Sequence, residues 1–124
     1  KVKKLGIKSA VMFLGNRNDV ADLYNAMDVF VLPSLYEGLP VVGVEVQANS
    51  LPFICSDKVT NEILLTDNIR LLSLQQYKTE WCNAILNAER KKIANKKDSL
   101  LKNFDIKSES KKLEELYLSL EVKE

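Results

Sequence analysis

The stretch at residues 29–57, "VFVLPSLYEGLPVVGVEVQANSLPFICSD", decides the fold of this chain. It opens with "VFVLPS" and closes with "FICSD", two short runs rich in β-branched and aromatic residues that are typical of buried strands. The segment between them is ambiguous, because its valines suit a strand whereas Pro40 stands where a helix could begin. The fold of this segment also determines where Glu37 and Glu45 lie.

The spacing of the two runs favours a helix. Eighteen residues separate Ser34 from Phe53, and a crossover between parallel neighbours takes about a dozen or more residues and is usually helical. We therefore predict a helix over residues 40–49, in which burial against the sheet outweighs a weak intrinsic propensity. Gly43 within this helix would allow close approach to the sheet or to a ligand.

The flanking sequence repeats the alternation of strand and helix patterns. The runs "VMFLG" (11–15) and "IRLLSL" (69–74) are predicted strands. The segment after "VMFLG" can form a helix capped by Asn18 or Asp19, and core packing is the favoured role of Tyr24 on that helix. Strands that alternate with helices predict an α/β fold, here a three-layer Rossmann-like domain with a parallel sheet flanked by helices.

The final part of the chain is helical in pattern. "YKTEWCNAILNAERKKIA" places Trp81, Ile85 and Leu86 on one face, which predicts that they pack in the core. After a break at residues 103–105, an amphipathic C-terminal helix is expected over residues 107–123. The apolar stripe of this helix consists of Leu113, Leu116, Tyr117 and Leu120.

Length and composition predict one soluble domain. The chain has 124 residues, of which 46% are hydrophobic and 28% charged, as in ordinary globular proteins. It begins "KVKKLGIKSA" without a methionine, so we expect a single domain over residues 1–124 that is truncated at its N-terminal edge. No apolar run approaches the ~20 residues of a membrane span and no signal peptide is present, so a cytoplasmic location is expected.

Charge and residue content exclude several classes of function. There is no histidine, which excludes Ser-His and Cys-His catalysis and histidine-ligated metals. Cys55 lies in an apolar run, where buried packing is expected. The net charge is +1, and the basic stretches at residues 1–4 and 89–97 lack interleaved aromatic residues, so no nucleic-acid partner is expected. Those stretches are read as solvated surface, with weak attraction to anionic lipid headgroups as the alternative.

Two glutamates flank the start of the predicted helix. Glu37 follows the carboxyl end of a strand, which is where open α/β sheets bind ligands. The amide end of the helix that begins near Pro40 favours an anion such as a phosphate, and Gly38 permits close backbone approach. Glu45 lies within the helix, so both carboxylates could border one crevice and accept hydrogen bonds from sugar or ribose hydroxyls. The structural alternative is that Glu37 complements the helix dipole and Glu45 is an ordinary surface residue.

The sequence also resembles a known family. "FLGNRNDVADLYNAMDVFVLPSLYEGLPVVGVEVQANSLPFICSD" closely resembles the C-terminal domain of retaining glycosyltransferases of the group 1 type, which have the GT-B fold. The likeness is strong over about residues 10–75, and Glu37 and Glu45 match the family's E-x7-E motif. The nearest resemblance is to enzymes of bacterial capsule, exopolysaccharide or lipopolysaccharide assembly. The chain would then be the donor-binding, C-terminal half of a GT-B fold.

The resemblance implies roles for named residues. Glu37 would be the catalytic residue and contact hydroxyls of the transferred sugar, and Glu45 would bind the ribose of the nucleotide. The base pocket would be lined by Leu14, Gly15 and Asn16. The residues expected to face the sugar and diphosphate through their backbone are Gly38, Leu39, Pro40 and Val41.

The resemblance also implies a reaction. A sugar would pass from a nucleoside-diphosphate sugar, with a UDP-sugar as the expected donor, to an acceptor hydroxyl with retention of anomeric configuration. No metal and no cofactor are expected, because positive groups and helix amides stabilise the leaving diphosphate. The family's diphosphate-binding Arg/Lys pair would lie upstream of Lys1, and a sugar or lipid-linked acceptor would bind mainly to an N-terminal domain. We therefore expect the isolated fragment to be inactive, and the full-length protein to be cytoplasmic or peripheral to the inner face of the membrane.

Two other classes of function remain as alternatives. The chain could be a non-catalytic nucleotide- or sugar-binding module, or it could belong to a sugar-nucleotide epimerase of GT-B-like shape. A dinucleotide oxidoreductase is disfavoured, because no G-x-G-x-x-G follows "VMFLG".

Overall fold

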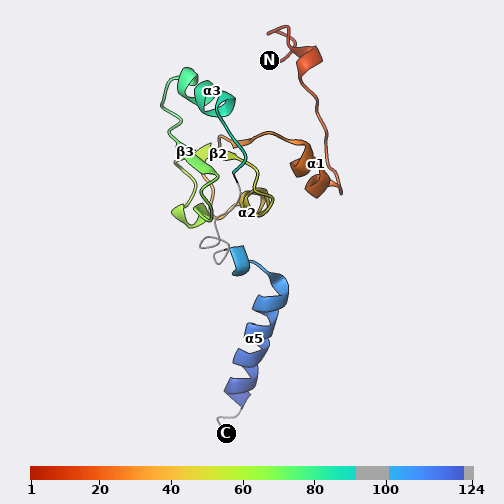
Figure 1. Cartoon of the computed structure of the whole chain (residues 1–124), viewed down its shortest axis with the longest axis vertical. Coiled ribbons are helices and arrows are strands. Elements are labelled where there is room, and N and C mark those ends of the chain that lie inside the picture. Colours follow the sequence, from red (N-terminus) through yellow and green to blue (C-terminus); the bar gives the residue numbers. More distant parts are fainter. Residues whose placement is uncertain (92–100, 122–124) are drawn as a thin grey trace.

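The computed structural model describes residues 1–91 and 101–121 (Figure 1). Strands and helices alternate along this part of the chain, as the sequence predicts. In chain order the elements are η1 (Lys8–Ala10), α1 (Val20–Ala26), β1 (Phe30–Leu32), α2 (Val41–Ala48), β2 (Phe53–Ser56), η2 (Asn61–Ile63), β3 (Ile69–Leu72), α3 (Lys78–Leu86) and α5 (Ile106–Glu121).

The sheet has three parallel strands in the order β1-β2-β3. Phe53 of β2 lies opposite Phe30 on one side and Ile69 on the other, so the strands are in register where they begin. Their carboxyl ends therefore meet at one edge of the sheet. Three of the four predicted strands, and the parallel α/β class, are confirmed.

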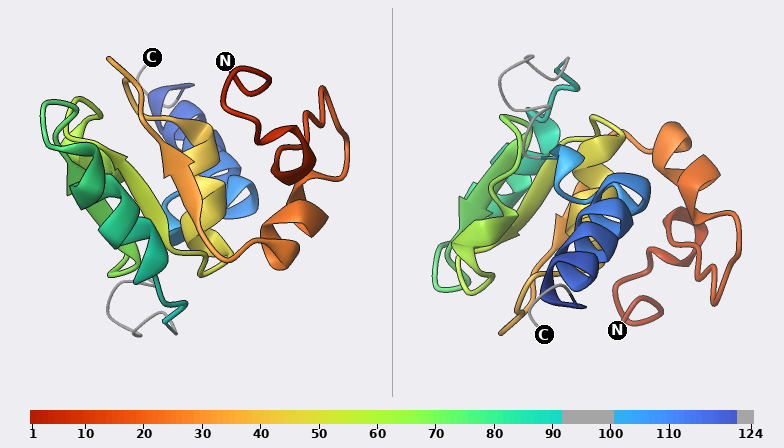
Figure 2. Two further views of the ribbon diagram at one scale, coloured as in Figure 1. Left: turned by 90° about the horizontal axis from the view of Figure 1, so that it is seen from above. Right: turned by 90° about the horizontal axis from the view of Figure 1, so that it is seen from below.

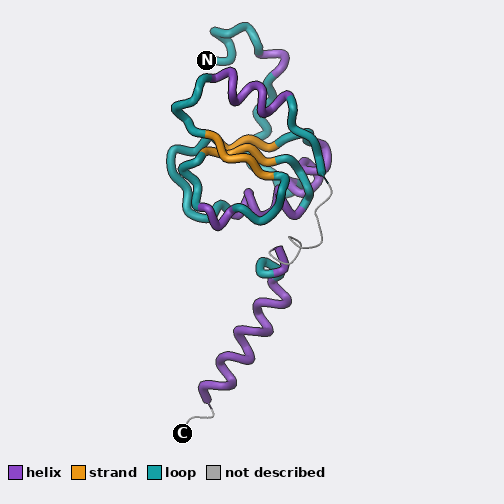
Figure 3. The backbone as a smooth tube through the Cα atoms, turned by 60° about the vertical axis from the view of Figure 1, so that its left-hand side comes forward, coloured by secondary structure: helices purple, strands orange, loops and turns teal. Residues whose placement is uncertain are grey.

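Helices cover both faces of this sheet. Figure 3 shows the strands between two helical layers, and the views in Figure 2 show α3 on one face and α2 on the other. On the central strand, Phe53 and Cys55 pack in the cluster under α2, whereas Ile54 packs with Leu72 and Ala84 under α3. Because side chains alternate along a strand, β2 contributes to both cores, and all four of its residues are buried. This is the expected three-layer arrangement.

Helix α2 begins where the sequence predicts. Pro40 is its N-cap residue, and the helix runs to Ala48. Gly43 faces the sheet so closely that a Cβ at this position would lie 2.7 Å from Ile63 Cδ1 and 2.9 Å from Phe53 Cε1. Of the two roles expected for this glycine, the structure shows close approach to the sheet.

The end of α2 is a Schellman motif. Ser50 has a positive φ of 59°, its N–H donates to Gln47 O, and the N–H of Leu51 donates to Val46 O. These bonds satisfy carbonyl groups that the helix leaves unpaired. Val46 and Leu51 are both fully buried, so the motif leads the chain directly from the helix into the core and on to β2.

Residues 11–15 are not a strand, contrary to prediction. They form no bridge to the sheet, and Met12 and Phe13 are 81% and 83% exposed. An apolar run indicates that a segment suits burial, but a strand also needs a neighbour to pair with and cover on its faces. In the described residues, β1 is an edge strand, and nothing pairs with its outer side.

Leu86 is not in the core, also contrary to prediction. Its side chain is 81% exposed at the last residue of α3. Trp81 and Ile85 are half-buried as expected, and they pack with the buried Ala84. Trp81, Ala84 and Ile85 follow the i, i+3, i+4 spacing of one helix face. Leu86 comes one residue after this set and points outward.

Helix α5 confirms the predicted C-terminal helix through Glu121, and the last two residues of the expected range, 122 and 123, fall outside the described residues. It extends away from the three-layer body (Figures 1 and 3). Its stripe of Leu113, Leu116, Tyr117 and Leu120 is 49–60% exposed. Among the described helices, none has both the length and the apolar content needed to cross a bilayer.

Candidate functional site

The loop after β1 carries Glu37 at the carboxyl edge of the sheet. Its half-buried carboxylate accepts a hydrogen bond of 3.0 Å from the hydroxyl of Ser34, two residues after the end of β1. The backbone of Glu37 also forms an isolated parallel bridge with Val59, just beyond β2. Two contacts therefore hold this glutamate at the rim where the strands end.

The N-terminus of α2 opens onto the same edge of the sheet. Pro40 is buried and has no N–H, and the N–H of Gly43 donates back to Pro40 O at 2.9 Å. The amide groups of Val41 and Val42 precede the first bonds of the helix, so they are the candidates to bind an anion. Val41 is 71% exposed, so this end of the helix is accessible.

Glu45 is held by a residue of another helix. The hydroxyl of Tyr24 in α1 donates a 2.8 Å hydrogen bond to Glu45 Oε2. Tyr24 is buried, as predicted. Burial, followed by the hydrogen bond and charge of Glu45, raises the pKa of Tyr24 to about 12, so its phenol stays protonated and remains a donor at neutral pH.

Glu45 lines two cavities. One, of about 510 Å³, is bordered on the α1 side by Asn18, Ala21 and Tyr24 and on the α2 side by Ala48 and Asn49. The other, of about 430 Å³, is mainly apolar and lies against residues 101–105. The full lining of the second cavity is Leu39, Val41, Val44, Glu45, Ala48, Leu101, Phe104 and Asp105.

The predicted residues are only partly brought together. Leu39, Val41 and Glu45 share the wall of the second cavity, and Pro40 lies between them as the cap of α2. Glu37 borders neither cavity that Glu45 lines. The other predicted residues, Leu14, Gly15, Asn16 and Gly38, are exposed in loops and likewise line neither cavity.

Several polar residues around Glu45 were not predicted as site residues. The amide of Asn49 donates to Asn25 Oδ1 at 2.8 Å, which joins the ends of α2 and α1. Arg90, after α3, donates to the carbonyl groups of Tyr24, Met27 and Asn49 at 3.0–3.1 Å. Sequence periodicity could identify Tyr24 as buried, but it could not show that its hydroxyl meets Glu45, because the two lie 21 residues apart.

Helix α1 starts at the predicted cap, but the capping differs. Asp19 is the N-cap residue and makes no side-chain cap bond. Its carboxylate instead accepts hydrogen bonds from Arg17, which lowers the pKa of Asp19. Asn18 lies between these two residues in the sequence and lines the larger cavity.

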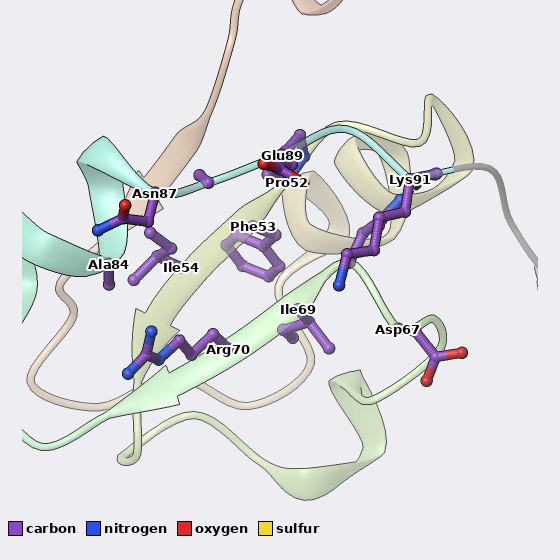
Figure 4. Close-up of a pocket in the computed structure, with 12 residues that line it drawn as sticks. Pro52, Phe53, Ile54, Asp67, Ile69, Arg70, Ala84, Asn87, Glu89 and Lys91 are labelled. Atoms are coloured by element: carbon purple, nitrogen blue, oxygen red, sulfur yellow. Dashed lines mark hydrogen bonds between the residues drawn. The ribbon is translucent and has the colours of Figure 1, made fainter.

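A third cavity lies at the opposite, amino end of the strands. Its volume is about 310 Å³, and Figure 4 shows Pro52, Ile69 and Arg70 on its walls together with Asn87 and Lys91 from beyond α3. Parallel α/β sheets bind ligands at the carboxyl ends of their strands. We therefore take the Glu37–Glu45 edge, and not this cavity, as the candidate site.

The chemistry of the candidate site is that of an anion and hydroxyl binder. Helix amides suit phosphate, and a carboxylate suits the paired hydroxyls of a sugar. Across residues 1–91 and 101–121, no group of three or more Asp, Glu, Cys or His side chains is close enough to hold a metal ion.

Comparison with known proteins identifies relatives. The family model described as "Glycosyl transferases group 1" matches residues 1–91. The putative glycosyltransferase EpsF of Bacillus subtilis (strain 168) is 40% identical over 89 residues, which cover 71% of this chain and 23% of EpsF. The UDP-Gal:alpha-D-GlcNAc-diphosphoundecaprenol alpha-1,3-galactosyltransferase of Escherichia coli is 30% identical over 125 residues, covering 95% of this chain and 32% of that protein.

A third glycosyltransferase matches over a shorter stretch. The N,N'-diacetylbacillosaminyl-diphospho-undecaprenol alpha-1,3-N-acetylgalactosaminyltransferase of Campylobacter jejuni is 44% identical over 48 residues, or 39% of this chain and 13% of that protein. No solved structure matches the chain. The chain thus spans about a quarter to a third of the length of EpsF and of the Escherichia coli relative.

Proposed function

This chain belongs to the group 1 glycosyltransferase family, and from this premise we propose that it is the donor-binding half of an enzyme that transfers a sugar from a nucleoside-diphosphate sugar to an acceptor hydroxyl. A UDP-sugar is the proposed donor and a bacterial surface polysaccharide the proposed product. Because an active site between two domains needs both, the isolated chain is expected to bind donor weakly and not to catalyse transfer.

One observation carries the proposal. At the carboxyl edge of a parallel sheet, α2 presents its amide end, and Glu45 five residues into the helix is fixed beside an open cavity of about 510 Å³. A diphosphate at the helix end would meet amide dipoles, and a ribose beside Glu45 would meet a carboxylate. A nucleoside diphosphate is the ligand class that offers both a phosphate and paired ribose hydroxyls.

The first glutamate is assigned to the transferred sugar. Glu37 stands at the same edge, with Ser34 holding one carboxylate oxygen, so its other oxygen is the one to accept from sugar hydroxyls. The backbone of Leu39 and Pro40 and the N–H of Val41 would border the sugar and diphosphate, with Gly38 allowing close approach. The exposed loop of Gly15 and Asn16 is assigned to the base.

Catalysis would consist of stabilising charge. When the sugar leaves the donor, negative charge develops on the diphosphate, and preorganised helix amides lower the energy of that state. Retention of configuration and independence of metal are part of the proposal. A lipid-linked acceptor is proposed because the Escherichia coli and Campylobacter jejuni relatives are named for diphosphoundecaprenol-linked substrates.

The test is Glu45→Ala in the full-length protein, measured as UDP affinity by isothermal titration calorimetry. Loss of hydrogen bonds from the ribose to a carboxylate is expected to weaken UDP binding by roughly tenfold or more. Glu114→Ala removes a carboxylate from the exposed face of α5 and should leave the affinity unchanged. Equal UDP affinity in wild type and Glu45→Ala would refute the ribose assignment.

A further inference from the structure

We propose that Tyr24 is a positioning residue that orients the Glu45 carboxylate toward the nucleoside, so that Glu45 Oε2 is occupied by the phenol and Oε1 is presented to the ribose. This inference rests on the proposed function and names a residue that the family motif does not contain. It also assigns the larger of the two cavities beside Glu45 to the nucleoside.

The ring of Tyr24 is fixed to the sheet. Only 4% of Tyr24 is exposed, and its ring packs edge-to-face on Phe30 of β1, with centroids 6.2 Å apart and an interplanar angle of 82°. Phe30 in turn packs on Phe53 of the central strand at 5.8 Å. The rings of Phe53, Phe30 and Tyr24 therefore pack in sequence from the core outward, and this packing sets the position of the Tyr24 hydroxyl.

Glu45 needs such support because its side chain is exposed. A free glutamate loses rotamer freedom when it binds a ligand, and this loss reduces affinity. The 2.8 Å bond from Tyr24 immobilises the carboxylate before the ligand arrives. Within residues 1–91 and 101–121, no hydrogen bond engages Glu45 Oε1, which leaves this oxygen as the acceptor for ribose.

The helix that carries Tyr24 is itself braced on α2. Arg90 binds the carbonyl groups of Tyr24 and Met27 at the end of α1, and it also binds both the carbonyl and the side-chain oxygen of Asn49 at the end of α2. Asn49 further donates to Asn25. Both views in Figure 2 show α1 alongside α2. These hydrogen bonds fix α1 against α2 and so hold the Tyr24 hydroxyl next to the Glu45 carboxylate.

The cavity beside this pair suits a nucleoside. It is lined by the side chains of Tyr24 and Glu45 and by Asn18, Asn49, Val20 and the small residues Ala21 and Ala48. Small apolar residues leave room for a ring, and the amides supply donors and acceptors. A ribose on the Glu45 side would place its base toward the start of α1, next to the loop of Gly15 and Asn16.

The experiment measures ribose recognition in the full-length protein. UDP, GDP and ADP are titrated by calorimetry to find the tightest-binding nucleotide, and the measurement is repeated with its 2′-deoxy analogue. Wild type should bind the ribonucleotide several-fold more tightly than the deoxy form. Tyr24→Phe should weaken ribonucleotide binding roughly tenfold, leave the deoxy form less affected, and so reduce the ribose preference. In turnover assays KM for the donor should rise while kcat stays within about twofold.

Controls separate positioning from folding. Tyr24→Phe keeps the ring that packs on Phe30, and Tyr77→Phe makes the same change at a side chain that is 84% exposed; it should alter neither affinity nor ribose preference. Glu45→Gln keeps an acceptor for Tyr24 but loses the charge, and it should also lower the preference.

The outcomes distinguish the two levels of the hypothesis. If Glu45→Gln lowers the ribose preference but Tyr24→Phe leaves it at the wild-type value, the positioning role is overturned and the proposed function stands. If wild type binds no nucleotide, or if Glu45→Gln has no effect on ribose preference, the proposed function fails and the role of Tyr24 fails with it. A uniform loss of affinity for ribose and deoxyribose forms in Tyr24→Phe would show a merely structural residue.

Discussion

Gly43 is the residue at which α2 lies closest to the sheet. Alanine favours a helix over glycine by about 1 kcal/mol. Replacing an exposed helical glycine by alanine would therefore stabilise the protein. Here the added Cβ would lie 2.7 Å and 2.9 Å from the side chains of Ile63 and Phe53, which are both fully buried. Overpacking of this kind costs about 1–3 kcal/mol, so the steric term outweighs the propensity term.

We therefore expect Gly43→Ala to lower the free energy of unfolding by about 1 kcal/mol. Gly38→Ala is the matched control, because a Cβ there would meet nothing within 4 Å. Urea unfolding of the two variants beside wild type measures the difference. A Gly43→Ala variant as stable as wild type would show that α2 can move away from the sheet without loss.

Residues of the site differ in how far sequence could identify them. Glu37 and Glu45 stood out because charge interrupts an apolar stretch, and the family resemblance supplied the roles that we propose for them. Tyr24 was placed in the core by its helical spacing, and the structure bears this out. Its hydroxyl bond to Glu45 depends on how α1 docks against α2, and no local pattern contains that information.

At the scale of elements, α2 is joined to the segment before β3 by one buried amide. The side chain of Gln47 is fully buried. Its Nε2 donates to the carbonyl groups of Gly43 and Ile63, and its Oε1 accepts from both the N–H and the hydroxyl of Thr66. Every hydrogen-bonding group of this amide is therefore used within the fold.

Replacing that amide by a hydrocarbon tests the connection. Gln47→Leu keeps the volume but leaves the buried Thr66 N–H and hydroxyl without the oxygen that accepts from both, which is expected to cost about 2–4 kcal/mol. The loss should appear as a lower urea midpoint and as faster amide exchange at residues 60–66. Gln75→Leu, at an exposed position, should do neither. Unchanged exchange in Gln47→Leu would contradict this role.

The elements that sequence predicted correctly are those whose partners are close along the chain. Strands β1 and β2 and the crossover helix α2 form one β-α-β unit, so chain length alone restricts their arrangement. Residues 11–15 and Leu86 were misassigned because apolar character favours burial but does not show which element of the fold would cover the residue. Nothing in the described chain pairs with residues 11–15, and Leu86 lies just past the packed face of α3.

At the scale of the whole molecule, the chain has the three-layer α/β architecture that we propose to be the donor-binding half of the enzyme. It covers 23% of EpsF and 32% of the Escherichia coli galactosyltransferase. Its sheet edge, α2 and the Tyr24–Glu45 pair would form one side of the proposed site, whereas catalysis in the proposed reaction also requires an acceptor held against it. Binding of the nucleotide is therefore the property of this chain that can be tested without the acceptor.

The most direct measurement is a protein-observed NMR titration of residues 1–124 with UDP. We expect saturable amide shifts, in the millimolar range or tighter, at Gly38, Val41, Val42 and Glu45 and in α1 around Tyr24. Shifts that gather instead around Arg70 and Asn87 at the amino end of the strands, or no saturable shifts at residues 37–45, would show that the start of α2 and Glu45 do not form the nucleotide site.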